Sequence, residues 1–207
     1  MLPRRSVALS LVSGRGHYES VIQAVEQAEI SVWIATANLK ELMVEDARAR
    51  PGRRRGGRRT AYRSVLDVFD ELAERGVELR ILHAGVASGP FARELRRHER
   101  LARGGLALRT CPRLHFKTVV IDGELLYLGS ANWTGAGLGA KGVGRRNFEL
   151  GIVTEDALLI DEVQGLYERL WRGALCRGCK LRSECGAPLD ELEASARVPD
   201  APPDVRK

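Results

Sequence analysis

The feature that most constrains the fold is an Asp-Gly pair, Asp122-Gly123, that lies between two runs of β-prone residues. A pair of this kind in such a setting predicts a tight β-hairpin with a type I′ turn. With these two residues as the loop, opposite residues of the two strands form fixed pairs. The expected pairs are Ile121 with Glu124, Val119 with Leu126, Lys117 with Leu128, and His115 with Ser130.

The predicted hairpin gathers polar side chains at its open end. Side chains alternate between the two faces of a sheet, and paired residues share a face. One face then carries His115, Lys117, Ser130 and Asn132. An ammonium and two neutral donors suit phosphate oxygens, and an imidazole can act as nucleophile or as general acid and base. No carboxylate cluster accompanies them, so we predict a phosphate site that needs no divalent metal for catalysis.

Hydrophobic periodicity predicts the rest of an α/β domain. Helical spacing covers residues 17–28, 62–75, 90–103 and 157–171, and β-rich runs cover residues 30–37, 77–82, 106–109 and 148–153. Strands that alternate with helices, together with one hairpin, predict a mixed β-sheet flanked by helices. We expect this domain to span residues 1–172. A cysteine-containing, metal-binding tail follows at 173–207, and we expect disorder after about residue 188 because the end is acidic and proline-rich.

The positive charge is concentrated in one segment. The 207 residues carry a net charge of +6, and seven arginines lie in the twelve residues from Arg48 to Arg59, without which the chain would carry −1. Such a local field suits a polyanionic partner, although a solvated loop of like charges is the alternative interpretation. We predict nucleic-acid contacts at Arg53, Arg54, Arg55, Arg58 and Arg59, and at Arg145 and Arg146 in a later glycine-rich loop.

The polar residues of the hairpin also form a recognisable pattern. A resemblance to the HKD signature of the phospholipase D superfamily is carried by His115-x-Lys117-x4-Asp122-x6-Gly129-Ser130-x-Asn132. Asn147-x-Glu149 resembles the downstream Asn-x-Glu element of that superfamily. The resemblance extends over about residues 15–172 and implies the superfamily's fold, with one HKD motif per chain.

The resemblance implies a metal-independent phosphodiesterase that cleaves single- or double-stranded DNA through a phosphohistidine. Superfamily enzymes use two HKD histidines, and compact bacterial endonucleases with a single motif form a homodimer with the active site across the interface. By this resemblance His115 attacks phosphorus, and the partner subunit's His115 protonates the leaving oxygen. Phosphate oxygens are then held by Lys117, Ser130 and Asn132, and Glu149 orients the imidazole. His83, after a predicted strand, is the alternative acid in a monomer.

Asp122 has two interpretations. The signature assigns it to the site, whereas the local chemistry of an Asp-Gly pair assigns it to the turn. We favour the structural role.

The four cysteines predict a second, separate site. Cys176, Cys179 and Cys185 lie close together near the C-terminus, and Cys111 is the candidate fourth ligand. The triple spacing resembles the iron–sulfur clasp of CRISPR-associated RecB-like nucleases and that of adenine-excising glycosylases. This resemblance implies a structural [4Fe–4S] cluster, with zinc, or no metal at all, as the alternatives.

Thiolate ligands indicate a reducing compartment, so we expect a cytoplasmic protein. No apolar run approaches the length of a membrane span, and the first residues are atypical of a secretory signal. The expected protein is thus a nuclease, with a DNA-processing or phage-defence system as its candidate context. The alternatives are a phospholipase or phosphatidyltransferase with the same site, and a non-catalytic nucleic-acid-binding subunit of a larger complex.

Overall fold

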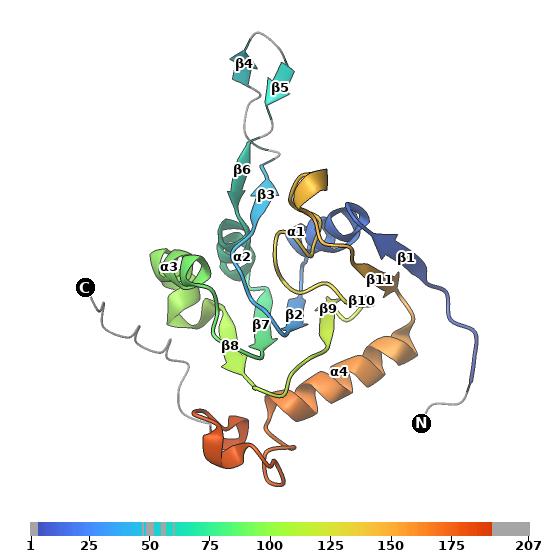
Figure 1. The fold of residues 1–207 in the computed structure, drawn as a ribbon, viewed down its shortest axis with the longest axis vertical. Helices are drawn as coiled ribbons and strands as arrows, with labels where there is room; N and C mark the ends of the chain where they lie inside the picture. Colours follow the sequence, from blue (N-terminus) through green and yellow to red (C-terminus); the bar gives the residue numbers. More distant parts are fainter. Residues whose placement is uncertain (1–3, 47, 49–51, 55–56, 60, 192–207) are drawn as a thin grey trace.

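A seven-stranded mixed sheet forms the centre of the protein in a computed structural model that describes residues 4–46, 48, 52–54, 57–59 and 61–191 (Figure 1). The strand order is β1-β11-β10-β9-β2-β7-β8, in which β2, β7 and β8 are parallel and all other neighbours are antiparallel. The strands are β1 (Ser10–Ser13), β2 (Ser31–Thr36), β7 (Glu78–His83), β8 (Ala107–Thr110), β9 (Lys117–Ile121), β10 (Leu125–Gly129) and β11 (Leu150–Thr154). The predicted mixed sheet flanked by helices is confirmed.

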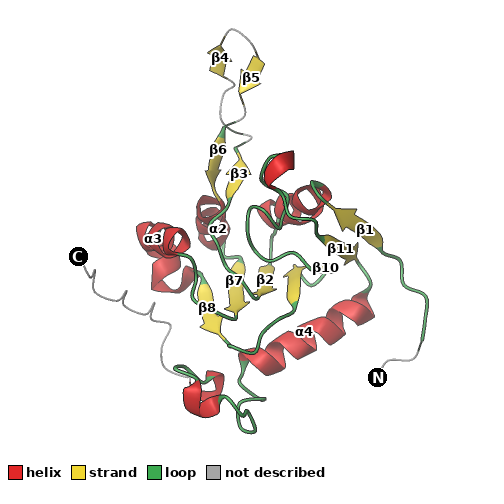
Figure 2. Ribbon diagram, in the orientation of Figure 1, coloured by secondary structure: helices red, strands yellow, loops and turns green. Residues whose placement is uncertain are grey.

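Helices cover both faces of this sheet (Figure 2). The larger core lies on one face, where the sheet packs against η1 (Tyr18–Ile22), α1 (Gln23–Glu26), α2 (Val65–Glu74), α3 (Gly89–Arg97) and η2 (Leu101–Gly105). On the other face, α4 (Ala157–Trp171) buries Ile160, Tyr167 and Trp171 against alternate residues of the same strands. The period-2 alternation of β2 explains this division, because Val32 and Ile34 face the larger core while Ala35 faces α4.

The helix predicted over residues 62–75 starts later than expected. Tyr62–Ser64 form β6, which pairs with β3 (Met43–Glu45), and α2 begins at Val65. Ser64 is the N-cap of α2, and its side chain forms a capping box with Asp67. A Ser/Thr N-cap satisfies backbone N–H groups that have no partner inside the helix. The N-cap at Ser64 therefore sets the start of α2, and hydrophobic periodicity alone did not indicate this position.

The helix predicted over residues 90–103 is interrupted. His98 has extended backbone angles (φ −91°, ψ 90°) and terminates α3 after Arg97. A separate turn, η2, follows. The interruption turns the chain at His98, which the apolar spacing alone did not indicate.

The predicted hairpin is present, but its register differs by one residue. Asp122 and Gly123 both have positive φ (55° and 71°), and the N–H of Glu124 donates to the carbonyl of Ile121 at 2.9 Å, as a type I′ turn requires. Glu124 is then an extra residue, and the observed pairs are Ile121 with Leu125, Val120 with Leu126, Val119 with Tyr127, Thr118 with Leu128, and Lys117 with Gly129. The predicted register was wrong because the observed one buries Leu126 against α4 and Tyr127 in the larger core.

The arginine-rich segment, expected as a loop, includes a second hairpin. β4 (Gly52–Arg54) pairs with β5 (Gly57–Arg59). Together with β3 and β6 they form an arm that extends away from the central sheet (Figure 1). β1 was also not predicted; it is an edge strand of the sheet and pairs with β11.

The C-terminal segment packs against the end of α4. Leu189 is buried in the cluster that contains Trp171, within the short helix η5 (Leu189–Glu191). The disorder predicted after about residue 188 concerns mainly residues 192–207, which lie outside the described residues. Among the helices that the structure describes, none is long and apolar enough to span a membrane.

Candidate active site

Apart from Asp122, the polar residues of the HKD pattern lie at one end of the sheet, where four neighbouring strands start or end. β2 ends at Thr36, β9 begins at Lys117, β10 ends at Gly129 and β11 begins at Leu150. Several polar residues just outside these strand ends therefore lie at the same end of the sheet. They are His115, Ser130, Asn132 and Glu149.

Lys117 begins β9, and His115 lies two residues before it. The His115 side chain is exposed, whereas Lys117 is only 8% exposed. The Lys117 ammonium donates to the carbonyl oxygen of His115 at 2.6 Å and lies 3.3 Å from its Nδ1. The backbone contact holds the charge beside the ring, so a phosphate that reaches the imidazole also meets the ammonium.

Ser130 and Glu149 are joined where β10 ends and β11 begins. The Ser130 hydroxyl donates to Glu149 Oε2 at 2.5 Å and accepts from the N–H of Leu150 at 3.1 Å. Glu149 Oε1 accepts from the Asn147 amide at 3.0 Å. Both oxygens of Glu149 thus have hydrogen-bond partners within the chain. That Glu149 orients the His115 imidazole stays a prediction.

Asn132 is fixed by the loop that follows β2. Its Oδ1 accepts from the backbone N–H of Asn38 at 2.9 Å and from the Thr36 hydroxyl at 3.4 Å. The Thr36 hydroxyl also accepts from the N–H of Trp133 at 2.9 Å. With Oδ1 occupied, the amide nitrogen of Asn132 remains as a donor for a ligand. Sequence analysis missed Thr36 and Asn38, although polar residues directly after a buried strand are a signal that could have indicated them.

Asp122 lies at the opposite end of β9 from His115. Its carboxylate accepts from three successive backbone N–H groups, those of Glu29, Ile30 and Ser31, at 3.0, 2.8 and 2.8 Å. These contacts fix the start of β2. The structure therefore places Asp122 in the turn and not with the other residues of the pattern.

The other histidines near this edge are buried. His83 is 4% exposed, its Nε2 lies 3.3 Å from the Thr110 hydroxyl, and burial lowers its pKa. His17 is fully buried beside Tyr127, and burial lowers its pKa as well. A neutral, buried His83 is poorly placed to protonate a leaving group.

The cysteines lie near the end of α4. All four are free and partly exposed, and Cys111 and Cys176 pack against the same apolar cluster. A hydrogen bond from Arg113 lowers the pKa of the Cys179 thiol. In the described part of the chain, no three of their sulfur atoms lie within 4.8 Å of one another. The predicted metal site at the four cysteines stays a prediction.

The predicted nucleic-acid contacts fall in two places. Arg53, Arg54, Arg58 and Arg59 belong to β4 and β5 of the arm, whereas Arg55 lies outside the described residues. Arg145 and Arg146 lie at η3 (Val143–Arg145), in the connection that leads from Asn132 to Glu149. Arg145 is exposed there, and Arg146 donates to the carbonyl of Lys141.

Comparison with known proteins agrees with this fold. A family model described as "Cardiolipin synthase, PLD-like domain" matches residues 21–171. The mitochondrial cardiolipin hydrolase of Chlamydomonas reinhardtii is 31% identical over 110 residues, which are 52% of this chain but 45% of that protein, so the chain matches less than half of its length.

Two solved structures share the architecture. NucT from Helicobacter pylori is 17% identical, with a TM-score of 0.52 over 79% of this chain and 95% of that one. The phospholipase D family member Nuc from Salmonella typhimurium is 17% identical, with a TM-score of 0.53 over 80% and 95%. With a family model that covers most of the domain, the chain belongs to the phospholipase D superfamily.

Proposed function

We propose that the protein is a phosphodiester hydrolase that cleaves DNA through a phosphohistidine at His115. The observation that carries the proposal is the exposed His115 ring beside the largely buried Lys117 ammonium. The Asn132 amide, at the same end of the sheet, would donate to a remaining phosphate oxygen, and Ser130 would do so once its hydroxyl turns from Glu149. Side-chain cations and donors would then neutralise the charge that develops on phosphorus.

The reaction would proceed in two displacements. First, a nitrogen of His115 forms a bond to phosphorus while the bond to the leaving oxygen breaks, and that oxygen takes a proton from a second acid. Water then attacks the phosphohistidine and gives a proton to the same group, which frees His115. The described chain has one exposed histidine at this edge, so we infer that the partner subunit's His115 is the second group.

An exposed apolar surface next to the site supports a homodimer. Leu11 on β1 and Leu150 on β11 are 71% and 61% exposed, and Phe148 beside them is fully exposed. Leu11 and Leu150 lie on the face opposite the buried Val12, and α4 leaves this end of the sheet uncovered. Contiguous exposed apolar side chains indicate an interaction surface. Glu149 lies between Phe148 and Leu150, so a copy docked here would adjoin the end of the sheet that carries His115 and Lys117, which is the catalytic edge.

The arginine arm favours nucleic acid as the substrate. Several arginines on a projecting hairpin can contact successive phosphates. A nucleic-acid duplex or single strand carries phosphates at regular spacing. Phospholipid is the second candidate, because the cardiolipin hydrolase of Chlamydomonas reinhardtii is a relative. A larger complex, and a role in DNA processing or phage defence, would be consistent with cleavage of DNA.

The His115→Ala variant tests the proposal. We expect cleavage of labelled DNA in EDTA to fall by about 10³-fold or more, because the nucleophile is removed. Single- and double-stranded DNA, RNA, and cardiolipin or phosphatidylcholine vesicles are compared in parallel. His83→Gln is the matched control, since glutamine keeps a polar group opposite Thr110, and it should retain activity.

Each contrary result has a definite meaning. Cleavage that survives His115→Ala overturns the assigned nucleophile, and loss of activity in His83→Gln would assign the second acid to the same chain. Hydrolysis of lipid alone would identify a phospholipase. DNA binding with no cleavage of any substrate would identify a non-catalytic subunit.

We also propose that Cys111, Cys176, Cys179 and Cys185 hold a structural [4Fe–4S] cluster, with zinc as the alternative, in a cytoplasmic protein. The shared packing of Cys111 and Cys176 supports it. Protein purified without oxygen should show an absorbance shoulder near about 400 nm. A colourless protein that releases zinc would contradict the cluster.

A further inference from the structure

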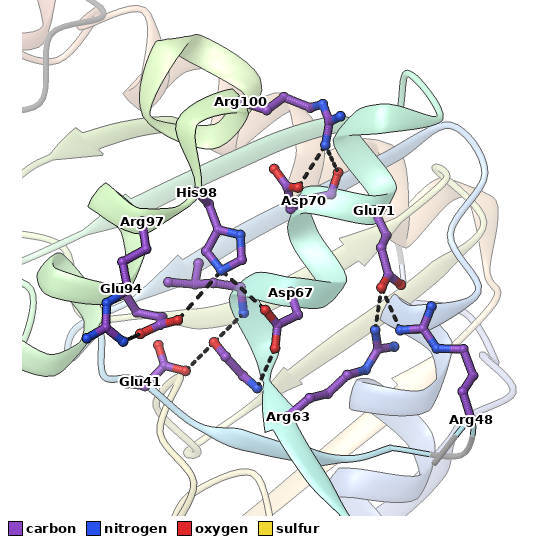
Figure 3. Close-up of polar contacts among 12 residues, drawn as sticks. Glu41, Arg48, Arg63, Asp67, Asp70, Glu71, Glu94, Arg97, His98 and Arg100 are labelled. Carbon is purple, nitrogen blue, oxygen red and sulfur yellow. Dashed lines mark hydrogen bonds and ion pairs between the residues drawn. The ribbon is translucent and has the colours of Figure 1, made fainter. Parts of the chain in front are cut away.

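Three metal-ligating side chains converge between α2 and α3 (Figure 3). His98 Nε2 lies 3.3 Å from Asp67 Oδ1 and 3.8 Å from Glu94 Oε1, and the three ligand atoms all lie within 4.8 Å of one another. Nitrogen and oxygen ligands of zinc stand about 2.0–2.2 Å from the ion, which separates neighbouring ligands by about 3.3 Å. Small side-chain rotations would therefore close this set around one ion.

The two carboxylates are already oriented toward His98. Asp67 Oδ2 accepts from the backbone N–H of Ser64 at 2.9 Å in the capping box, which leaves Oδ1 to face the ring. Glu94 Oε2 accepts from Arg97 at 2.9 Å, which leaves Oε1. Glu94 and His98 are four residues apart, on one face of α3 at its end. Outer hydrogen bonds of this kind hold ligands in place before a metal binds.

A buried carboxylate oxygen beside this cluster is an observation independent of the ligand spacing. Glu41 Oε2 is buried and has no hydrogen bond among the described residues, whereas the buried His98 Nε2 faces the Asp67 and Glu94 oxygens without a hydrogen bond of normal geometry. Glu41 is held by its other oxygen, which accepts from the Ser64 hydroxyl at 2.6 Å. Buried polar atoms normally have partners, so the unpaired Glu41 oxygen beside these side chains points to a bound ligand.

The charge of the cluster also favours a cation. The carboxyl groups of Asp67 and Glu94 both approach the His98 imidazole, and the arginine that pairs with Glu94 is itself largely exposed. A divalent ion among them would offset their mutual repulsion.

We propose that His98, Asp67 and Glu94 bind a first-row divalent transition metal of the zinc class, with Glu41 as a fourth ligand. One imidazole among carboxylates suits zinc and its neighbours, whereas magnesium and calcium prefer oxygen ligands alone. The site shares no residue with the catalytic edge or with the four cysteines. Its ligands come from α2, α3 and the segment between β2 and β3, so the metal links three parts of the fold.

A metal at this site would stabilise the backbone segment that positions Asn132. Glu41 follows Asn38, whose N–H holds the Asn132 side chain, and Lys40, whose N–H donates to the carbonyl of Trp133 at 3.0 Å. A ligand that fixes Glu41 therefore restrains the backbone that positions Asn132. The role is structural, because no ligand of this set is among the residues that contact phosphate in the proposed reaction.

The test is zinc binding by the full chain, measured by calorimetry after treatment with a chelator. We expect His98→Ala and Glu94→Gln each to bind one zinc ion fewer per chain than the wild type. Zinc should raise the thermal midpoint of the wild type more than that of either variant, because it binds only the folded site. The cysteines are unchanged in all these proteins, so the difference isolates this cluster.

Glu99→Gln is the matched control, because Glu99 is exposed and pairs only with Arg103 among the residues that the structure describes. It should bind as many zinc ions as the wild type. Equal zinc stoichiometry in the wild type, His98→Ala and Glu94→Gln would overturn the proposal. Circular dichroism checks folding, and Glu94→Gln, which alters a partly exposed side chain, decides the outcome where His98→Ala fails to fold.

Discussion

At the scale of single residues, Asp122 shows how one position of a catalytic signature can serve the fold. Its carboxylate receives three backbone N–H groups at the start of β2, and its positive φ allows the turn. Aspartate tolerates this conformation because its short polar side chain bonds to nearby backbone. His115, Lys117, Ser130 and Asn132, by contrast, lie at the other end of the hairpin.

We predict that Asp122→Ala lowers the free energy of unfolding by about 1–3 kcal/mol, because three backbone donors lose their acceptor and alanine disfavours positive φ. Urea denaturation at pH 7 measures the change. The kcat/KM of the folded fraction should stay within about threefold of the wild type. Asp161→Ala, at an exposed position on α4, is the control. A fall in kcat/KM at unchanged stability would return Asp122 to the catalytic set.

The residues of the site were predictable to different degrees. His115 and Lys117 are adjacent in the sequence pattern and adjacent in space. Thr36 and Asn38 contact Asn132 although 96 and 94 residues separate them from it in the chain, and no local spacing indicates such a contact.

At the scale of elements, the two hairpins behaved differently. The turn at Asp122-Gly123 was predicted from its residues, but an extra residue after the turn shifted every pair, because burial of Tyr127 and Leu126 on opposite faces decided the register. The arm was not predicted, since arginine-rich segments lack the alternation of a half-buried strand. The pairing of β3 with β6 brings together the two ends of the arginine-rich segment.

We predict that serine substitution of Arg53, Arg58 and Arg59 weakens DNA binding mainly by removing cations that neutralise phosphates. For duplex DNA, the slope of log affinity against log salt should become less steep by about 0.9 for each phosphate that is no longer neutralised. Fluorescence anisotropy at several salt concentrations measures this slope. The matched control replaces Arg93, Arg96 and Arg103, which are exposed on or after α3. Equal changes in both triple variants would show that net charge, and not the arm, governs binding.

At the scale of the whole molecule, the proposed site would require a surface for a second copy. The apolar residues of β1 and β11 border the catalytic edge, and an interface of this kind pairs the same patch on both subunits. Two single sites would then face each other.

We predict that Leu11→Asp or Phe148→Asp converts a dimer to a monomer, because an unpaired carboxylate in an apolar interface is strongly unfavourable. Light scattering coupled to size exclusion measures the mass, and phosphodiesterase activity should fall together with it. Leu175→Asp, which charges another exposed leucine at the opposite end of α4, should leave both unchanged. A variant that is monomeric and fully active would contradict the shared site.

The sequence by itself determined the fold class and the hairpin turn, and it predicted the residues of the proposed site, because these depend on the alternation of side chains and on a short pattern of residues. Only the tertiary structure decided the register, the structural place of Asp122, the hold on Asn132 and the meeting of Asp67 with Glu94 and His98. Each of these depends on contacts between distant segments. The free energy of such contacts comes from packing the whole core, and local spacing does not report it.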